Sequence, residues 1–105
     1  MDVVVHRIRL HESTDPARFE QWVRDVDYAT CPDIPSIRAF GVHRVSTEAA
    51  APFHYFEVIS LTSADEFARD MKTEAFRGLE AEFDSMASVI DEVAGTRVEP
   101  GYSAI

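Results

Sequence analysis

Apolar and β-branched residues alternate with polar ones, or form short runs, in four separate stretches of the chain. The first stretch, residues 2–10 (DVVVHRIRL), predicts a strand. A second strand is predicted from Ser36 onward (SIRAFGVHRVS), a third over 53–61 (FHYFEVISL), and a weaker fourth over 91–99 (DEVAGTRVE). The alanine-rich loop TEAAAP joins the second and third strands into a hairpin.

Helical periodicity occupies the two long intervals between these strands. Asp15 and Pro16 are typical of an N-cap and a first helical residue, and the helix that they open should end near Cys31-Pro32. Ser63 with Glu66 forms a capping-box pattern that opens another helix. A further helical stretch is predicted from about Thr73 to Ile90, and its buried stripe contains Phe76, Leu79, Phe83, Met86 and Ile90.

The resulting order is strand, helix, strand, strand, helix, strand. This order is typical of the α+β ferredoxin-like fold, βαββαβ, in which a four-stranded antiparallel sheet has both helices on one face. The length predicts a single domain over residues 1–105, with residues 98–105 as a tail that forms an arm or is disordered.

The two faces of the predicted sheet are both apolar, which a sheet covered by helices on one side does not require. Strand 2–10 is apolar on both faces, and strand 53–61 places Tyr55 and Ile59 on one side against Phe56 and Val58 on the other. Stacking this face on a second copy of the chain buries it. The pattern therefore predicts a homodimer, an α/β barrel whose two sheets enclose a small pocket.

Composition narrows the classes of partner. Nineteen acidic and ten basic side chains give a formal charge of −9, which disfavours nucleic acid and anionic membrane surfaces. The N-terminal apolar stretch contains His6 and Arg7 and is too short and too polar for a signal sequence or a membrane span. These features predict a cytoplasmic protein without nucleic-acid or membrane partners.

The histidines are the main candidates for chemistry, because imidazole titrates near neutral pH. His6 lies on the same strand face as Val4 and Ile8, and His54 lies in the third strand. Since the first and third strands are neighbours in this fold, we expect the two imidazoles to lie close together if they share a face. The competing interpretation of His6 is a core histidine satisfied by one hydrogen bond.

Three further residues complete the candidate site. Asp27 and Tyr28 end the first helix, where a carboxylate and a phenol could orient a histidine or stabilise an oxyanion, although Tyr28 falls opposite the apolar stripe. His43, on the second strand, is a secondary candidate whose face the pattern does not fix.

Cys31 has no basic neighbour in sequence and fits a small buried hydrophobe better than a nucleophile. The chain has no HxH pair, HExxH motif, P-loop or GxGxxG, so no metal or cofactor is predicted.

Several segments carry a family resemblance: VVHRIRL, FEQWVRDVDYATC, SIRAFGVHRVS, PFHYFEVISL and EFDSMASVI. Over most of its length, to about Val98, the chain resembles the RedY-like (HapK) family of small dimeric α/β-barrel proteins from pathways to prodiginine and bis-indole natural products. In the wider superfamily, polyketide cyclases carry barrel-facing histidines on the first and third strands. His6, in the context H-x-I-x-L, and His54, three residues before Glu57, match those two positions.

The resemblance implies a cofactor-free enzyme of hydrolase or cyclase type. Its substrate would be a small aromatic, indole- or pyrrole-derived intermediate, with His6 and His54 as general acid and base. The residue pattern, and not the resemblance, adds Tyr28, Asp27 and His43 as groups that orient the histidines or stabilise an oxyanion. Two alternatives stay open at this point: a non-catalytic carrier of a hydrophobic pigment precursor, and a cofactor-less monooxygenase. Fold alone does not choose among them.

Overall fold

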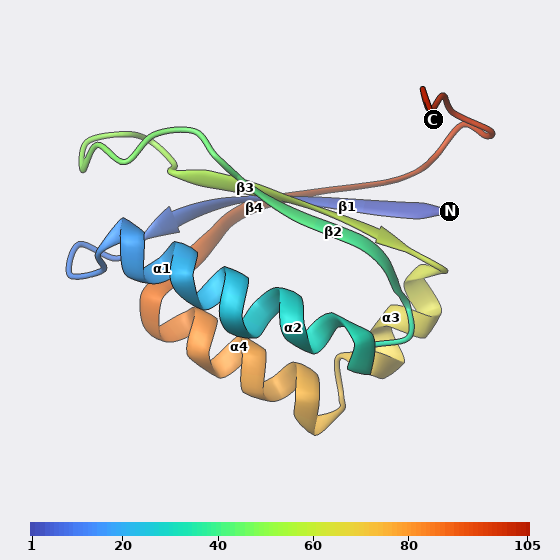
Figure 1. Cartoon of the computed structure of the whole chain (residues 1–105), viewed down its shortest axis with the longest axis horizontal. Coiled ribbons are helices and arrows are strands. Elements are labelled where there is room, and N and C mark those ends of the chain that lie inside the picture. The colour runs from blue at the N-terminus through green and yellow to red at the C-terminus, as the bar shows by residue number, and fades with distance from the viewer.

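Four antiparallel strands form one sheet in the order β2-β3-β1-β4. The strands are β1 (Asp2–Leu10), β2 (Ile37–Arg44), β3 (Tyr55–Leu61) and β4 (Ala87–Thr96) in a computed structural model that describes all 105 residues. Figure 1 shows α1, α2, α3 and α4 on the same side of the sheet, which leaves its other face uncovered. The predicted ferredoxin-like fold is confirmed.

Side-chain caps start the helices at the residues that the sequence indicates. Asp15 accepts a hydrogen bond from the backbone of Ala17 and opens α1 (Pro16–Trp22), and Ser63 accepts one from Glu66 and opens α3 (Ala64–Asp70). Thr73 caps α4 (Glu74–Met86) in the same way. These caps use backbone N–H groups that have no partner within the helix.

The first helical segment is not uniform. After α1, a π-helical turn, η1 (Val23–Asp27), leads into α2 (Tyr28–Thr30) and a short 3₁₀ turn, η2 (Cys31–Asp33). The predicted end near Cys31-Pro32 is confirmed, but the pattern gave no sign of the π turn. Single π turns inside helices widen the backbone and occur frequently at functional sites. Here the π turn ends at Asp27.

The last helix is shorter than predicted. It ends at Met86, and Ala87 takes an extended conformation with φ of −154° that begins β4. The expected helix to Ile90 and the expected strand over 91–99 are therefore both wrong in their boundaries. The run Ala87–Ile90 contains Val and Ile, which favour strands, and it gains ladder hydrogen bonds by pairing with the end of β1.

The core fills the space between the sheet and the helices. One cluster of buried side chains centres on Ile8 and Leu10 of β1, Phe19 of α1 and Tyr55 of β3. A second, smaller cluster joins Ile59 and Leu61 of β3 to Phe67 of α3. The apolar face of β1 and β3 that contains these residues therefore packs against the helices, and Val3, Val5, Phe56 and Val58 take the uncovered face.

No helix of this chain is long and apolar enough to cross a membrane.

Candidate active site

A cavity of about 390 Å³ lies between the sheet and the helices of a single chain. Sixteen of its 22 lining residues are hydrophobic, and these include the second core cluster around Ile59 and Phe67. The apolar pattern of the strands predicts a pocket between the stacked sheets of two chains. That placement is wrong for His6, because the face of β1 that bears it is the face covered by helices.

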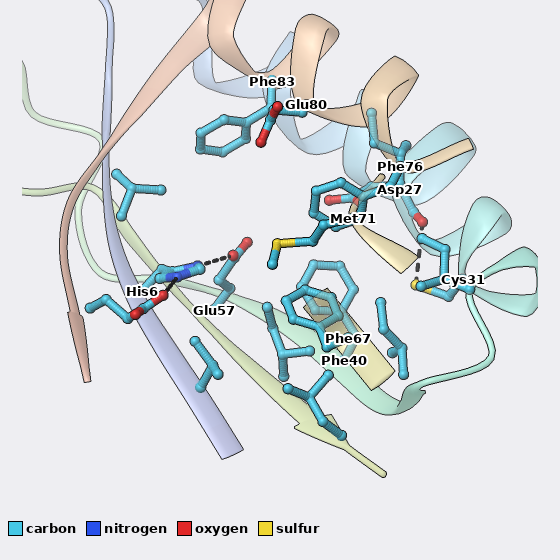
Figure 2. A pocket seen from close by; sticks show the side chains of 18 of the residues that line it. His6, Asp27, Cys31, Phe40, Glu57, Phe67, Met71, Phe76, Glu80 and Phe83 are labelled. Atoms are coloured by element: carbon cyan, nitrogen blue, oxygen red, sulfur yellow. Dashed lines mark hydrogen bonds and ion pairs between the residues drawn. The ribbon is translucent and has the colours of Figure 1, made fainter. Parts of the chain in front are cut away.

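His6 is the centre of the polar part of this cavity. Its Nδ1 is 2.7 Å from a carboxylate oxygen of Glu57, and its Nε2 is 2.7 Å from one of Glu92. The three residues are direct neighbours across the ladder, because His6 of β1 pairs with Glu57 of β3 on one side and with Glu92 of β4 on the other. Figure 2 shows the imidazole and the Glu57 carboxylate together at the wall of the cavity.

The two carboxylates stabilise the protonated imidazole. The hydrogen bond to Glu57 is the largest cause that raises the pKa of His6 above its ordinary value of 6.5; burial opposes this shift, and Glu92 adds to it. The side chains of His6 and Glu57 are 17% and 13% exposed, whereas that of Glu92 is 58% exposed. The His6–Glu57 pair is thus the shielded part of the group, and such perturbed, partly buried pairs are typical of sites of proton transfer.

Asp27 reaches the same cavity from the helical layer, at the end of the π turn. Burial, together with the negative charge of Glu57, raises the pKa of the Asp27 carboxyl to about 7 from its ordinary 3.8. No hydrogen bond from the protein to this carboxylate offsets the cost of its burial. The cavity therefore holds two titratable groups whose pKa values are raised, His6 on the sheet and Asp27 on the helix.

Cys31 also lines the cavity, one helical turn after Asp27. Its thiol donates a hydrogen bond to the Asp27 carbonyl over 3.5 Å. Burial, with the nearby carboxylates of Asp27 and Glu57, raises the thiol pKa to about 11. The thiol therefore stays protonated at neutral pH, which agrees with the interpretation of Cys31 as a small apolar residue.

His54 does not share the cavity with His6, and the expected pair of strand histidines is wrong. Its ring is buried just before β3, where Nδ1 accepts a hydrogen bond of 2.9 Å from the Leu10 backbone N–H. The other nitrogen, Nε2, donates to the Glu48 carbonyl over 3.0 Å. Both ring nitrogens are thus occupied by backbone groups, so His54 connects the β2–β3 loop to the end of β1.

Tyr28 and His43 also lie outside this cavity. The Tyr28 hydroxyl accepts a hydrogen bond of 3.0 Å from the Val42 backbone N–H, and its ring packs edge-on against Phe40. The His43 ring stacks on Phe56, at 4.8 Å between centroids, on the uncovered face of the sheet. The structure therefore brings together only His6 and Asp27 of the five predicted site residues.

Comparison with known proteins supports the family resemblance that the sequence segments indicate. A model of the family "REDY-like protein HapK" matches residues 2–98. The chain belongs to the REDY-like HapK family. It is also similar to the crystal structure of HapK from Hahella chejuensis, with 48% sequence identity, a TM-score of 0.96 and coverage of 99% of both chains.

More distant structures share the fold of this HapK-family chain. SnoaB from Streptomyces nogalater, a cofactor-independent oxygenase, is 18% identical at a TM-score of 0.73, and the match covers 94% of each chain. A dimeric ferredoxin-like protein of unknown function from Thermobifida fusca is 20% identical at a TM-score of 0.66, over 90% of this chain and 86% of the other. No curated protein gives a significant match.

Glu57 and Glu92 belong to the site but are not among the residues predicted from the sequence. Glu57 alternates with Tyr55 and Ile59 on an otherwise apolar strand face, and a charge in such a row is a signal for a buried polar site. Glu92 gave no comparable signal, because its contact with His6 depends on the register of β4 against β1. In this HapK-family chain that register includes an irregularity between Arg7 and Ile8.

Replacement of Asp27 by Asn should stabilise the folded chain at neutral and alkaline pH. Because the carboxyl pKa is near 7 when folded and 3.8 when unfolded, the folded state binds more protons between these values and loses stability as pH rises through them. We expect Asp27→Asn to raise the free energy of unfolding by about 2–4 kcal/mol at pH 8 and to have little effect at pH 4. Urea denaturation at both pH values measures the difference.

Asp25→Asn is the matched control, because Asp25 is exposed in the same π turn and its loss removes the same charge. Equal effects of the two substitutions at pH 8 would contradict the burial of an ionisable Asp27.

Proposed function

We propose that this chain is a cofactor-free acid–base enzyme that acts on a small aromatic molecule held in the cavity. The observation that carries the proposal is the position of His6, which lines an apolar cavity with a carboxylate on each ring nitrogen. A structural histidine would be expected to satisfy its nitrogens with backbone groups, as His54 does. The ring nitrogens of His6 instead contact two carboxylates, so the imidazole can donate a proton and accept it again.

The two carboxylates have different roles in this proposal. Glu57 is the shielded partner beside the substrate: the proton on Nδ1 of the imidazolium passes to Glu57, which delivers it to the substrate, and the reverse transfer removes a proton. Glu92 accepts a hydrogen bond from Nε2–H throughout. It therefore keeps that proton on Nε2 when the ring is neutral, and it stabilises the imidazolium when Nδ1 is also protonated. An orienting carboxylate on the far nitrogen has the same effect in catalytic triads.

Asp27 is the second proton-transfer group. It faces the Glu57 side of the cavity from the helical layer, and a pKa of about 7 leaves it able to act as acid or base at neutral pH. Hydrolysis and cyclisation, the reaction types implied by the family resemblance, both require a group that donates a proton and another that accepts one. Two titratable groups on opposite walls of the cavity meet this requirement.

The aromatic nature of the substrate is supported by the walls of the cavity. Trp22, Phe40, Phe76 and Phe83 line it, and a volume of about 390 Å³ suits a molecule with one or two fused rings. The family resemblance favours an indole- or pyrrole-derived intermediate of natural-product biosynthesis. The alternative function, a carrier that binds such a molecule without turnover, differs in having no need of His6.

We also propose that the chain functions as a homodimer through the uncovered face of the sheet. This face presents Val3, Val5, Phe56 and Val58, and Val93 on β4 is 68% exposed. A similar structure, the Thermobifida fusca protein, is described as dimeric. Burial of these side chains against a second copy removes an apolar patch from water, and it leaves the cavity on the helix side of each chain intact.

His6→Asn should strongly slow proton transfer while leaving binding in place. Indole-3-acetone is a suitable probe, because exchange of its methylene protons for deuterium requires acid–base catalysis and is followed by NMR in deuterated buffer. We expect the wild-type chain to accelerate exchange over buffer, and His6→Asn to reduce the acceleration by about 10²-fold or more with the dissociation constant little changed.

His11→Asn is the matched control, since His11 is exposed in the loop after β1. Glu57→Gln provides a second variant of the same group if His6→Asn impairs folding. Binding of the ketone without acceleration of exchange in the wild-type chain would favour the carrier, and equal exchange in wild type and His6→Asn would refute the role of His6.

Val93→Glu should convert the dimer to a monomer, because it places two like charges in the buried patch of a two-fold interface. Val98→Glu, at a residue that is 90% exposed in the C-terminal segment, should leave the dimer intact. Sedimentation velocity measures both states. A monomeric wild-type chain, or a dimeric Val93→Glu variant, would contradict an interface on this face.

A further inference from the structure

The charged side chains around the cavity are strongly biased in sign. Five carboxylates from four parts of the fold line it, and His6 is the single basic residue among the lining side chains; no Lys or Arg is present. The carboxylates are those of Asp27, Glu57, Glu80, Asp84 and Glu92. With His6 protonated the group is still negative, so the field inside the cavity attracts positive charge and repels negative charge.

The carboxylates differ in whether they have a hydrogen-bond partner within the protein. Glu57 and Glu92 are both occupied by His6. Asp27 makes no hydrogen bond that stabilises its carboxylate, and it lies in the same cavity within the field of Glu57. A partly buried carboxylate without a partner is costly, and a ligand that supplies a positive N–H group would remove that cost.

The apolar walls of the cavity favour the same type of ligand. Trp22, Phe40, Phe76 and Phe83 line the volume that the carboxylates surround. Figure 2 shows the rings of the three phenylalanines at the cavity. Aromatic faces carry negative electrostatic potential and attract organic cations, and carboxylates beside aromatic rings are a combination that binds protonated amines. The exposed Glu80 and Asp84 on α4 extend the negative lining to solvent.

We infer that the cavity selects a cationic nitrogen-containing aromatic ligand, with its positive N–H group bound by the carboxylate of Asp27 and its ring against the aromatic walls. This inference rests on the proposed function and adds the charge of the substrate to it. Aromatic carboxylates and phosphates of the same size are rejected, because no Lys or Arg lines the cavity and the one basic side chain, His6, is already held by Glu57 and Glu92.

Three indoles of similar size but different charge test the inference. Tryptamine is a cation at pH 7.5, tryptophol is its neutral counterpart, and indole-3-acetate is an anion. Isothermal titration calorimetry with the wild-type chain should give a dissociation constant for tryptamine roughly tenfold lower than that for tryptophol, and weaker binding still for indole-3-acetate. Equal binding of tryptamine and tryptophol, or tighter binding of indole-3-acetate, would overturn the inference.

A pair of variants separates the Asp27 carboxylate from the general negative charge of the chain. Asp27→Asn should weaken tryptamine binding by roughly fivefold or more and change tryptophol binding by less than about twofold. Asp25→Asn removes the same charge from an exposed position of the same turn, and should change neither. Equal effects of the two variants on tryptamine would refute the assignment of Asp27 as the group that binds the cation.

The outcome is independent of the test of catalysis, because the exchange probe indole-3-acetone is neutral. If that ketone undergoes His6-dependent exchange but tryptamine binds no more tightly than tryptophol, the proposal of an acid–base enzyme is supported and the inference of a cationic substrate is refuted. If none of the three indoles binds, the inference is also overturned. If tryptamine binds with Asp27-dependent preference but exchange does not depend on His6, the cavity is a carrier site for cations.

Discussion

The register of the central strand is the constraint on which the site depends. β1 lies between β3 and β4, and His6 is paired directly with Glu57 on one side and with Glu92 on the other. A shift of either ladder by one residue would turn the carboxylate to the opposite face of the sheet and leave the imidazole without that partner. The same registers place Ile8 and Leu10 in the core, so burial of apolar side chains fixes the position of the polar group.

The cavity is maintained at some cost to stability. A fully packed interior would fill the space beside Phe67 and Phe76, and it would not place Asp27 among apolar side chains with Glu57 nearby. The π turn that ends at Asp27, and the carboxylates that crowd His6, are features that folding alone does not require. Such departures from optimal packing are typical of sites selected for function.

The sequence predicted the fold well, because its signals are local. Caps at Asp15 and Ser63, the four strand patterns and the loop between the second and third strands together indicate the ferredoxin-like order of elements. The end of α4 was misplaced because the apolar residue Ile90 fits both a helical stripe and a strand. The site was predicted only in part: His6 and Asp27 stood out as titratable residues beside apolar stripes, whereas Glu92 joins them through a strand register that no local pattern reveals. His54 looked equivalent to His6 by strand position, but its ring nitrogens bind backbone.

The protonation state of His6 can be measured by NMR of the chain with ¹⁵N-labelled histidine as a function of pH, and it tests the proposed acid–base group directly. We expect both ring nitrogens of His6 to give imidazolium shifts at pH 6.5 and its pKa to lie above the ordinary value, because Glu57 and Glu92 each accept a hydrogen bond from a ring N–H. His54 provides an internal reference, because its two ring nitrogens bind backbone groups and no carboxylate. A neutral His6 at pH 6.5, with a pKa at or below the ordinary value, would contradict the proposed acid–base group.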